Sequence, residues 1–416
     1  MGPGISVDGA RLRADLEALG RIGAVPGGGV SRTSFSPADA QARDWYRARC
    51  AEAGLTVQVD GIGNMFVSRP DESPAGDALP AVWSGSHLDS VPNGGRFDGA
   101  LGAVAALECV RRLHEERIVL RRPVRSVVYS DEEGNYSHLF GSSALVRGFS
   151  AAQLQELTGR DGDRFADTFA AAGWDLARAT RTRVDPGTVH ATVELHIEQG
   201  PQLERLGHQI GIVTAIVGLG GGTVTFRGRP DHAGTTPMTM RKDALAGASA
   251  LIVQFPRIAR SVSDRAVLTA GIISVEPGGS NVVPGTAYLT VDFRDLQRAN
   301  VDRLADTIAA AAQAVATEQG LEVDVEFEPT IPPSQLDDRI QQIIGAAAAA
   351  RGLAASALPS GAGHDSQNLA ALAPTGMIFV PSAGGRSHCP EEHTDWQDVE
   401  NGANVLLDTV ITLADA

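Results

Sequence analysis

The sequence predicts an α/β protein in which one domain is inserted into another. The chain has 416 residues, a length expected for about two domains of ordinary size. Short apolar runs alternate with helix-like stretches over most of the chain, and this order favours a mixed, largely parallel sheet. The middle of the chain has a different order of elements. We therefore expect residues 1–210 plus 331–416 to form one α/β domain and residues 211–330 to form the inserted one.

The elements of the first domain follow from the spacing of apolar residues. Residues 7–53 have apolar side chains at helical intervals, interrupted by a Gly- and Ser-rich stretch in which Ser36 and Pro37 make a good helix start. Residues 99–117 and 337–353 also predict helices. Five short apolar runs predict strands, at 55–60, 64–70, 81–87, 124–133 and 191–200.

The inserted segment has its own order of elements, which is strand, helix, strand, strand, helix, strand. The expected ranges are 211–228, 238–255, 266–277, 285–295, 299–320 and 321–330. This βαββαβ order is that of the ferredoxin-like fold, a small sheet with helices on one face.

Composition excludes several classes of function. Lys plus Arg is 35 and Asp plus Glu is 50, so the net charge is −15, which argues against nucleic acid or an anionic membrane as partner. No signal peptide and no apolar run of about 18 residues is found, so we expect no membrane span. Cys50, Cys109 and Cys389 form no CxxC pair, which favours a reducing cytoplasm over a disulfide framework. The expected partner is a small molecule or another protein.

Histidines and carboxylates occur at the ends of predicted strands, where ligand sites of parallel sheets lie. Together they offer the mixed nitrogen and oxygen ligands that a divalent metal takes. A single loop histidine is more often solvated, and a Glu-Glu-Gly turn is usually an exposed turn. The combination favours a metal site because six such residues fall in loop-like contexts: His87, Asp98, Glu132, Glu133, His196 and His388.

Eight motifs resemble one known family. They are "GSHLDSVPNGGRFDGALG", "SDEEGNYSHLFGS", "ELHIEQGPQLE", "DHAGTTPMTMRKDAL", "GGSNVVPG", "VDFRD", "SGAGHDSQNLA" and "PSAGGRSHCPEEHTDW". In this order and over almost the whole chain, they are similar to the hydantoinase/carbamoylase branch of the two-metal aminoacylase and carboxypeptidase superfamily. That branch contains N-carbamoyl-L-amino acid hydrolases, β-ureidopropionases and allantoate amidohydrolases. The resemblance implies a metal-binding α/β domain and a smaller inserted domain used for dimerisation.

The resemblance also implies roles for the metal-site residues. Asp98 would bridge two divalent ions, His87 and His196 would complete one site, and Glu133 and His388 would complete the other. Zinc is expected, with manganese, cobalt or nickel as alternatives. Glu132 would be the general base, and Asp89 would hold the His87 imidazole; the alternative for Asp89 is a cap of its own loop.

Further residues are assigned to the substrate by the resemblance. Arg294 would bind a substrate carboxylate, and its alternative is a surface pair with Asp295. His232 would reach the active site of the partner subunit and stabilise the oxyanion, so the enzyme would work as a homodimer. Asn281 and Gln199 would contact the substrate, or be ordinary turn and loop residues, and the role of His364 is open. The remaining histidines are expected to be structural: His114, His138, His190, His208 and His393.

The expected activity is hydrolysis of the ureido amide bond of an N-carbamoyl-L-amino acid, releasing ammonia, carbon dioxide and the amino acid. His196 favours this reading, because peptidase members of the superfamily usually have a carboxylate as that ligand. The alternatives are allantoate, β-ureidopropionate, a dipeptide or N-acyl amino acid as substrate, or a metal-free binding protein. One departure is Tyr136 and His138 in "EEGNYSHLFGS", where carbamoylase relatives often have a compact Arg-Phe pair.

Overall fold

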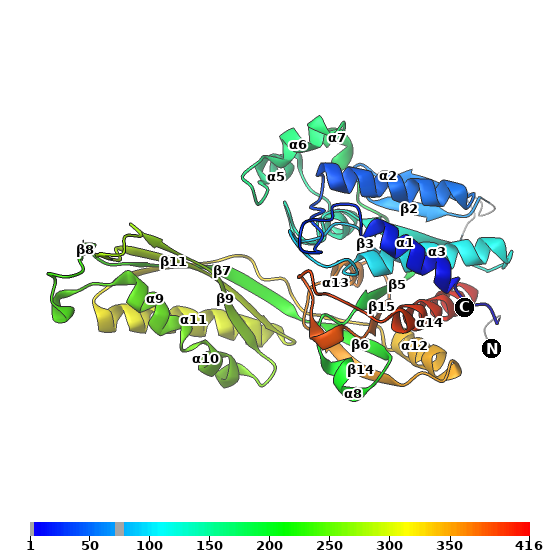
Figure 1. Cartoon of the computed structure of the whole chain (residues 1–416). Coiled ribbons are helices and arrows are strands. Elements are labelled where there is room, and N and C mark those ends of the chain that lie inside the picture. Colours follow the sequence, from blue (N-terminus) through cyan, green and yellow to red (C-terminus); the bar gives the residue numbers. More distant parts are fainter. Residues whose placement is uncertain (1–3, 71–78) are drawn as a thin grey trace. The chain divides into compact units, whose positions relative to one another are not determined.

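The chain folds into two compact units, shown in the computed structural model of Figure 1, which describes residues 4–70 and 79–416. Unit 1 consists of Met1–Thr214, Gln335–Ser360 and His364–Ala416, and unit 2 of Ala215–Ser334 with Gly361–Gly363. Both ends of the insertion lie four residues later than the ranges expected from the sequence. The reason is that the strand running into unit 2 is still paired with the large sheet at Ile212.

Unit 1 contains most of a nine-stranded mixed sheet, in the order β1-β2-β4-β3-β5-β15-β6-β13, with β14 paired to β6. The central strands β4, β3, β5 and β15 are parallel, whereas β1, β2 and β6 join them antiparallel. The mixed, largely parallel sheet predicted from the sequence is confirmed. The strands are β1 (Thr56–Val59), β2 (Met65–Ser68), β3 (Ala81–His87), β4 (Val124–Tyr129), β5 (Val189–Ile197), β6 (Ile210–Ile216), β13 (Ser334–Gln335), β14 (Ala355–Ser360) and β15 (Thr375–Val380).

The long helices of unit 1 cover this sheet. All residues of β3 are buried, as expected of a central strand with helices on both faces. Helix α2 begins after Ser36, whose side chain accepts a hydrogen bond from the Asp39 amide. The long helices are α1 (Gly9–Leu19), α2 (Pro37–Glu52), α3 (Ala100–Glu115), α12 (Asp338–Ala350) and α14 (Trp396–Asp415).

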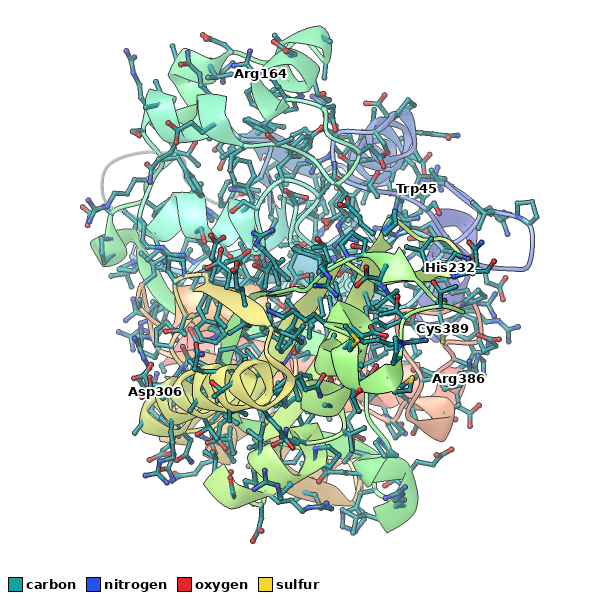
Figure 2. All side chains as sticks on the ribbon, turned by 90° about the vertical axis from the view of Figure 1, so that its left-hand side faces the viewer. Trp45, Arg164, His232, Asp306, Arg386 and Cys389 are labelled. Atoms are coloured by element: carbon teal, nitrogen blue, oxygen red, sulfur yellow. The ribbon has the colours of Figure 1, made fainter. Side chains whose placement is uncertain are left out.

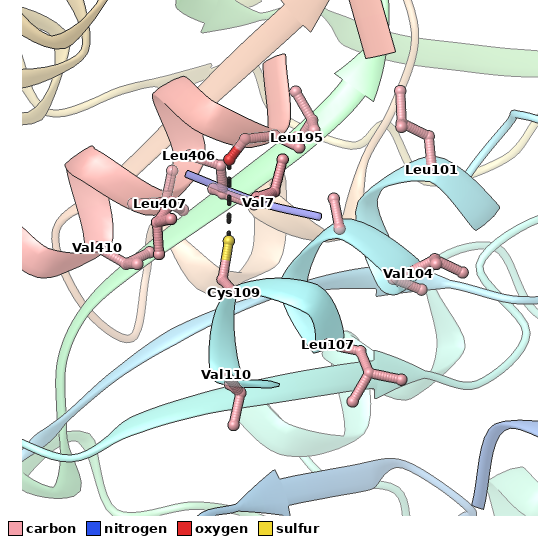
Figure 3. Close-up of a cluster of buried hydrophobic side chains, with 14 of the residues drawn as sticks. Val7, Leu101, Val104, Leu107, Cys109, Val110, Leu195, Leu406, Leu407 and Val410 are labelled. Carbon is pink, nitrogen blue, oxygen red and sulfur yellow. Dashed lines mark hydrogen bonds between the residues drawn. The ribbon is translucent and has the colours of Figure 1, made fainter. Parts of the chain in front are cut away.

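The main core lies where α3 packs against α14 and β5. Figure 3 shows Leu101 and Cys109 of α3 facing Leu195 and Leu406, with the Cys109 thiol donating to the Ala403 carbonyl at 3.9 Å. Burial raises the pKa of this thiol well above its ordinary value. Cys109 is therefore an unreactive core residue, and Cys50 and Cys389 are also free thiols.

Short helices that the sequence analysis did not predict fill the connections of unit 1. Those after β4 pack round a small aromatic cluster that includes Tyr136, Phe140 and Phe165. The short helices are α4 (Phe140–Val146), α5 (Ala151–Glu156), α6 (Phe165–Ala171), α7 (Leu176–Ala179), α8 (Gln202–Leu206) and α13 (Asp365–Leu369), with 3-10 turns at Pro186–Thr188 and Ala383–Gly385.

Unit 2 has a four-stranded antiparallel sheet in the order β12-β7-β11-β9. Its helices lie on one face of this sheet (Figure 1), and the βαββαβ order expected from the sequence is present. The helix expected at 238–255 is shorter than predicted, since only Ala244–Ile252 is α-helical. A second helix that was not predicted follows at Phe255–Val262, with Pro256 in its first turn. The elements are β7 (Gly218–Arg227), β8 (Asp231–His232), a 3-10 turn at Met238–Met240, α9 (Ala244–Ile252), α10 (Phe255–Val262), β9 (Val267–Glu276), β10 (Val282–Val283), β11 (Thr286–Asp295), α11 (Arg298–Gln319) and β12 (Glu322–Phe327).

Within the described residues, none of the helices combines the length and the apolar character that crossing a membrane requires.

Candidate metal centre and active site

Five residues predicted as metal ligands converge at the carboxyl ends of the parallel strands. His87 ends β3, His196 lies near the end of β5, and Glu133 follows β4. Asp98 lies just before α3, and His388 lies on the loop that follows β15. The fold therefore brings together side chains that are up to about 300 positions apart in the sequence, at the sheet edge where such sites form.

Asp98 occupies the middle of this cluster. Its Oδ1 atom is 3.1 Å from Nε2 of His196 and 3.9 Å from Nε2 of His87. Its Oδ2 atom is 3.1 Å from Nε2 of His388, which is 3.6 Å from the Glu133 carboxylate. Two groups thus share Asp98, and in each the candidate ligand atoms lie within 4.8 Å of one another. Two ligands of one tetrahedral ion lie roughly 3.4 Å apart, so this spacing fits a metal pair.

Main-chain hydrogen bonds orient the two buried imidazoles. Nδ1 of His87 is 2.9 Å from the Asp89 carbonyl, and Nδ1 of His196 is 2.9 Å from the Ile197 carbonyl. A carbonyl only accepts, so each Nδ1 carries a proton and each Nε2 points to the centre, where it can bind a metal ion once it is deprotonated. Gly99 makes this possible, because a Cβ there would lie 2.3 Å from the His87 ring.

Asp89 differs from its predicted role. Its carboxylate is 3.8 Å from Nδ1 of His87, too far for a hydrogen bond, and the main-chain carbonyl takes that place. The carboxylate accepts instead from the Glu133 amide at 3.1 Å, so it joins the His87 loop to the Glu132–Glu133 loop. Its other oxygen, Oδ1, is buried and makes no hydrogen bond within the described chain.

Glu132 lies beside the two groups without belonging to either. It is buried, and its carboxylate is 3.5 Å from Nε2 of His87. Burial, with the neighbouring charge of Glu133, raises the pKa of Glu132 well above its ordinary value. A carboxyl group with a raised pKa next to a candidate metal pair is suited to accepting and returning a proton.

The raised pKa values of several side chains show that the carboxylates of this cluster lack neighbouring positive charge. Burial and repulsion from Asp98 raise the pKa of Glu133 to about 8. Burial alone would lower the pKa of His196, but its hydrogen bond with Asp98 raises it to about 9. The hydrogen bond with Asp98 also raises the pKa of His388 to about 9. Protons thus occupy positions where cations would relieve the same repulsion, so the residues present fit a divalent metal pair.

A third group of potential ligands, Glu194, His196 and His364, fits a metal less well. Both Glu194 oxygens already accept hydrogen bonds, from Ser86 and Ser366. Nε2 of His364 is 2.9 Å from the Ser360 hydroxyl. His364 is buried edge-on against His196, with ring centroids 4.5 Å apart, and burial lowers its pKa well below the ordinary value. It therefore supports the His196 ring as a neutral imidazole.

Gln199 lies against the second group. Its Nε2 atom donates to Oδ2 of Asp98 at 2.9 Å, and its Oε1 atom is buried with no partner in the described chain. Gln199 also has a left-handed backbone, with φ of 57°. Because buried amide oxygens are normally hydrogen-bonded, this atom is available to a ligand bound in the centre.

The remaining predicted residues lie in unit 2, at opposite ends of its sheet. His232 pairs with Val282, next to Asn281, and both His232 and Asn281 are exposed; Figure 2 labels His232 at the surface. Arg294 lies near the other end of β11. Its guanidinium binds Asp292 at 2.9 and 3.2 Å and the Gly361 carbonyl at 2.9 Å.

The alternative pairing of Arg294 with Asp295 is wrong. Strand neighbours point to opposite faces, so Arg294 and Asp292 share a face that Asp295 does not. Asp295 is buried and accepts from Asn300 and the Gln297 amide at the start of α11.

The unusual segment after the two glutamates folds against the short helices of unit 1. Tyr136 packs in the aromatic cluster and donates to Asp163. Arg160, from the same helical region, donates to the Glu133 carbonyl at 2.7 Å. The departure at Tyr136 therefore joins these helices to the loop that carries Glu132 and Glu133.

None of the five histidines expected to be structural belongs to a potential metal group in residues 4–70 and 79–416.

Sequence reasoning missed two polar residues of the centre, Ser387 and Glu392. Both flank His388 in the "SHCPEE" motif, and only that nearness could have indicated them.

A cavity of about 470 Å³ lies elsewhere in unit 1, between α2 and the segment near Trp174, and contains none of the predicted site residues.

Comparisons with known proteins agree with this geometry. The model of peptidase family M20/M25/M40 matches residues 83–412. The N-carbamoyl-L-amino-acid amidohydrolase of Paenarthrobacter aurescens is 38% identical over 402 residues, covering 95% of this chain and 96% of that protein. The allantoate amidohydrolase of Escherichia coli (strain K12) is 33% identical over 411 residues, covering 97% of each. A crystal structure of a hydantoinase/carbamoylase family amidase from Burkholderia vietnamiensis has a TM-score of 0.90 and 35% identity, covering 100% of both chains.

The resemblance predicted from the eight motifs is confirmed by these matches. The chain is a hydrolytic enzyme that acts on amide C–N bonds, in a family whose enzymes depend on metals. It belongs to peptidase family M20/M25/M40 and, within it, to the hydantoinase/carbamoylase amidases.

Proposed function

We propose that the enzyme hydrolyses the ureido amide bond of N-carbamoyl-L-amino acids and releases ammonia, carbon dioxide and the amino acid. The observation that carries the proposal is the pair of ligand groups sharing Asp98, with His196 in the first group and Glu132 beside both. Relatives named N-carbamoyl-L-amino-acid amidohydrolase, such as that of Geobacillus stearothermophilus at 38% identity, support it.

Two divalent ions would be held by these groups, one by His87, Asp98 and His196 and the other by Asp98, Glu133 and His388. Zinc suits this set of histidines and carboxylates, and manganese, cobalt and nickel are the alternatives. Once bound, such a pair lowers the pKa of water and polarises the scissile carbonyl.

Among the side chains of the protein, Glu132 is the one that transfers the proton in this reaction. Its carboxylate accepts a proton from the attacking water and returns it to the leaving nitrogen. In the metal-free protein, burial and the nearby Glu133 raise the pKa of Glu132 above its ordinary value. Asp89 keeps Glu132 in place indirectly, by binding the next amide along the loop.

The substrate is expected to be anionic. Two divalent ions carry four positive charges, and Asp98 with Glu133 balances two of them, so the loaded centre attracts a carboxylate. Arg294 would bind that carboxylate in a bidentate manner, in exchange for Asp292. Gln199 offers its unpartnered Oε1 to the carbamoyl nitrogen, and Asn281 and His232 would contact the carbonyl side.

The arrangement of unit 2 supports a homodimer. Arg294 is eight residues beyond Thr286 in β11, or about 26 Å along the strand, whereas His232 pairs before that strand begins. The two residues of one chain are therefore too far apart to contact one small substrate. If both do so, His232 comes from a second copy. The edge strand β9 exposes Val267, Ile272 and Ile273, which a second copy would cover.

Allantoate is the second candidate substrate. Relatives at 32% and 33% identity are named allantoate amidohydrolase, and the segment at Tyr136 departs from the usual carbamoylase pattern beside Glu132 and Glu133. Both substrates are ureido acids, so the same centre serves either.

As to location, three free cysteines suit the reducing cytoplasm predicted from the sequence.

The proposal is tested by ammonia release from the metal-free protein after addition of zinc or manganese. The panel contains N-carbamoyl-L-amino acids, β-ureidopropionate, allantoate and dipeptides. We expect metal-dependent ammonia from an N-carbamoyl-L-amino acid at the highest kcat/KM. Ammonia from allantoate alone would favour the second candidate. Cleavage of dipeptides without ammonia from any ureido compound would contradict both.

A further inference from the structure

Glu392 is a buried carboxylate that joins two loops of the candidate metal centre. It is 2% exposed and follows His388 by four residues. Its Oε1 atom accepts hydrogen bonds from the amides of Phe97 and Asp98, at 2.8 and 3.1 Å. Its Oε2 atom accepts from the Ser387 hydroxyl at 2.8 Å. Both oxygens are therefore used, each toward a different loop.

The two loops each carry a residue proposed to bind metal. Asp98 is in the loop that binds Oε1 of Glu392. His388 is in the loop that binds Oε2 of Glu392, directly after Ser387. The Ser387 hydroxyl is also 3.2 Å from Oδ2 of Asp98, so it lies between the two carboxylates. Because it has a single proton, its donation to Glu392 leaves Oδ2 of Asp98 to face His388 and Gln199.

The surrounding backbone leaves room for this carboxylate. A Cβ at Gly95 would lie 2.0 Å from Glu392 Oε1 and Cδ, so only glycine allows the loop before Asp98 to close over it. A glutamate side chain buried this fully would be costly without its three donors. Glu391, the preceding residue, is exposed and binds Arg386 at 3.0 Å; Figure 2 shows Arg386 at the surface.

The His388 loop needs this support more than the Asp98 loop does. His388 has a left-handed backbone, with φ of 56°, which is strained for a residue other than glycine. The carbonyls of Phe97 and Asp98 also accept from the first amides of α3, at 2.8 and 2.6 Å, so that loop has a second attachment. Loss of the Glu392 contacts should displace His388 first.

We propose that Glu392 is a positioning residue that holds Asp98 and His388 at the separation needed to bind a metal ion between them. The proposal rests on the metal centre of the proposed function. Glu392 acts through these two residues and does not touch the ion or the substrate.

The test is a metal titration of the stripped full-length protein with zinc against a chromogenic chelator. The variants are Glu392→Gln, Glu392→Ala and the matched control Glu391→Gln. We expect two ions per chain in the wild type and in the control. In Glu392→Gln the ion held by Asp98, Glu133 and His388 should lose about 10-fold in affinity, and in Glu392→Ala up to about 100-fold, the range seen when residues behind metal ligands are changed. Glutamine keeps an acceptor for the two amides but cannot accept from Ser387, so partial retention is expected of it.

Equal affinities in Glu392→Gln, Glu392→Ala and Glu391→Gln, with two ions bound, would overturn the inference and leave the proposed function standing. A wild type that binds no ion would overturn the proposed centre and the inference with it. If Glu392→Ala does not fold, Ser387→Ala removes the Oε2 contact, together with the Ser387 contacts to Asp98 and Gln199, and leaves both amide contacts of Glu392 in place. It should weaken the same ion, and an unchanged affinity in Ser387→Ala and Glu392→Gln would contradict the positioning role.

Discussion

Replacing Glu132 with glutamine separates catalysis from metal binding. The substitution keeps the volume of the side chain and removes its ability to accept a proton. Glu132 is 5% exposed and belongs to neither ligand group, so both groups keep all their ligands. A general acid or base contributes about 10²- to 10⁴-fold to a rate. We therefore expect kcat to fall at least about 100-fold, or about 2.7 kcal/mol of activation free energy at 1.36 kcal/mol per tenfold.

The neighbouring residue provides the control. Glu133 lies one position further along the same loop, and its carboxylate is in the group with Asp98 and His388. Glu133→Gln should lose affinity for one ion, and adding metal should restore part of its activity. Glu132→Gln should bind two ions as the wild type does, and no excess of metal should restore its activity.

Stability gives a further check on Glu132→Gln. Burial and the charge of Glu133 raise the pKa of Glu132, so its ionised form destabilises the metal-free protein. The metal-free variant should therefore melt at the same temperature as the wild type at pH 8, or higher. The assay is ammonia release at saturating zinc, with bound metal and melting temperature measured on the same sample. A variant that keeps more than about a tenth of wild-type kcat would refute the assignment of Glu132 as the base.

Three other predictions concern the dimer, the substrate and pH. His232→Ala and Glu132→Ala, each inactive, should recover up to about a quarter of wild-type activity after subunit exchange, since half the dimers are mixed and each has one intact site; no recovery after proven exchange would contradict a cross-subunit role. Arg294→Lys should raise KM at least about 10-fold with little change in kcat, because lysine lacks the bidentate fork; an unchanged KM would exclude Arg294 from substrate binding. The folded metal-free protein holds protons with pKa values of about 8 at Glu133 and about 9 at His196, against ordinary values of 4.5 and 6.5, so its unfolding free energy should fall as pH rises from 6 to 9. Melting curves at saturating zinc should lack that slope, and a metal-free protein that gains stability over this range would contradict the charge argument.

Much of the fold could be predicted from local sequence. The central strand β3 is a continuous apolar run, and Ser36 with Pro37 marks the start of α2, because each of these signals acts within a few residues. The order of elements in unit 2 was equally readable. Helix α10 was not predicted, since it follows α9 after only two residues and is eight residues long. The short helices after β4 have little periodicity of their own.

Individual site contacts were harder to predict than the site itself. The spacing of His87 and Asp98 indicates a metal loop, but not whether the carboxylate or the carbonyl of Asp89 holds the imidazole. That choice depends on the Glu133 amide, 44 positions away, which takes the carboxylate. Glu392 was missed for a similar reason. The two amides that donate to its carboxylate, those of Phe97 and Asp98, lie nearly 300 positions before it in the sequence. Contacts between loops have no local signal, so residues that act through them are found only once the loops are placed.

The charges of the centre explain why these loop contacts are so numerous. Asp98, Glu132, Glu133 and Glu392 are all wholly or largely buried within one region, and like charges at this distance oppose folding. Main-chain amides from neighbouring loops bind two of these carboxylates, Glu133 and Glu392, and fix their directions, but amides supply no net positive charge. The fold therefore holds the ligands in place before a cation arrives and leaves their repulsion to be relieved by it. An ion that binds only the folded state stabilises it by about 2.7 kcal/mol at a concentration 100 times its Kd. The same arrangement thus makes the centre both prepared for metal and less stable without it.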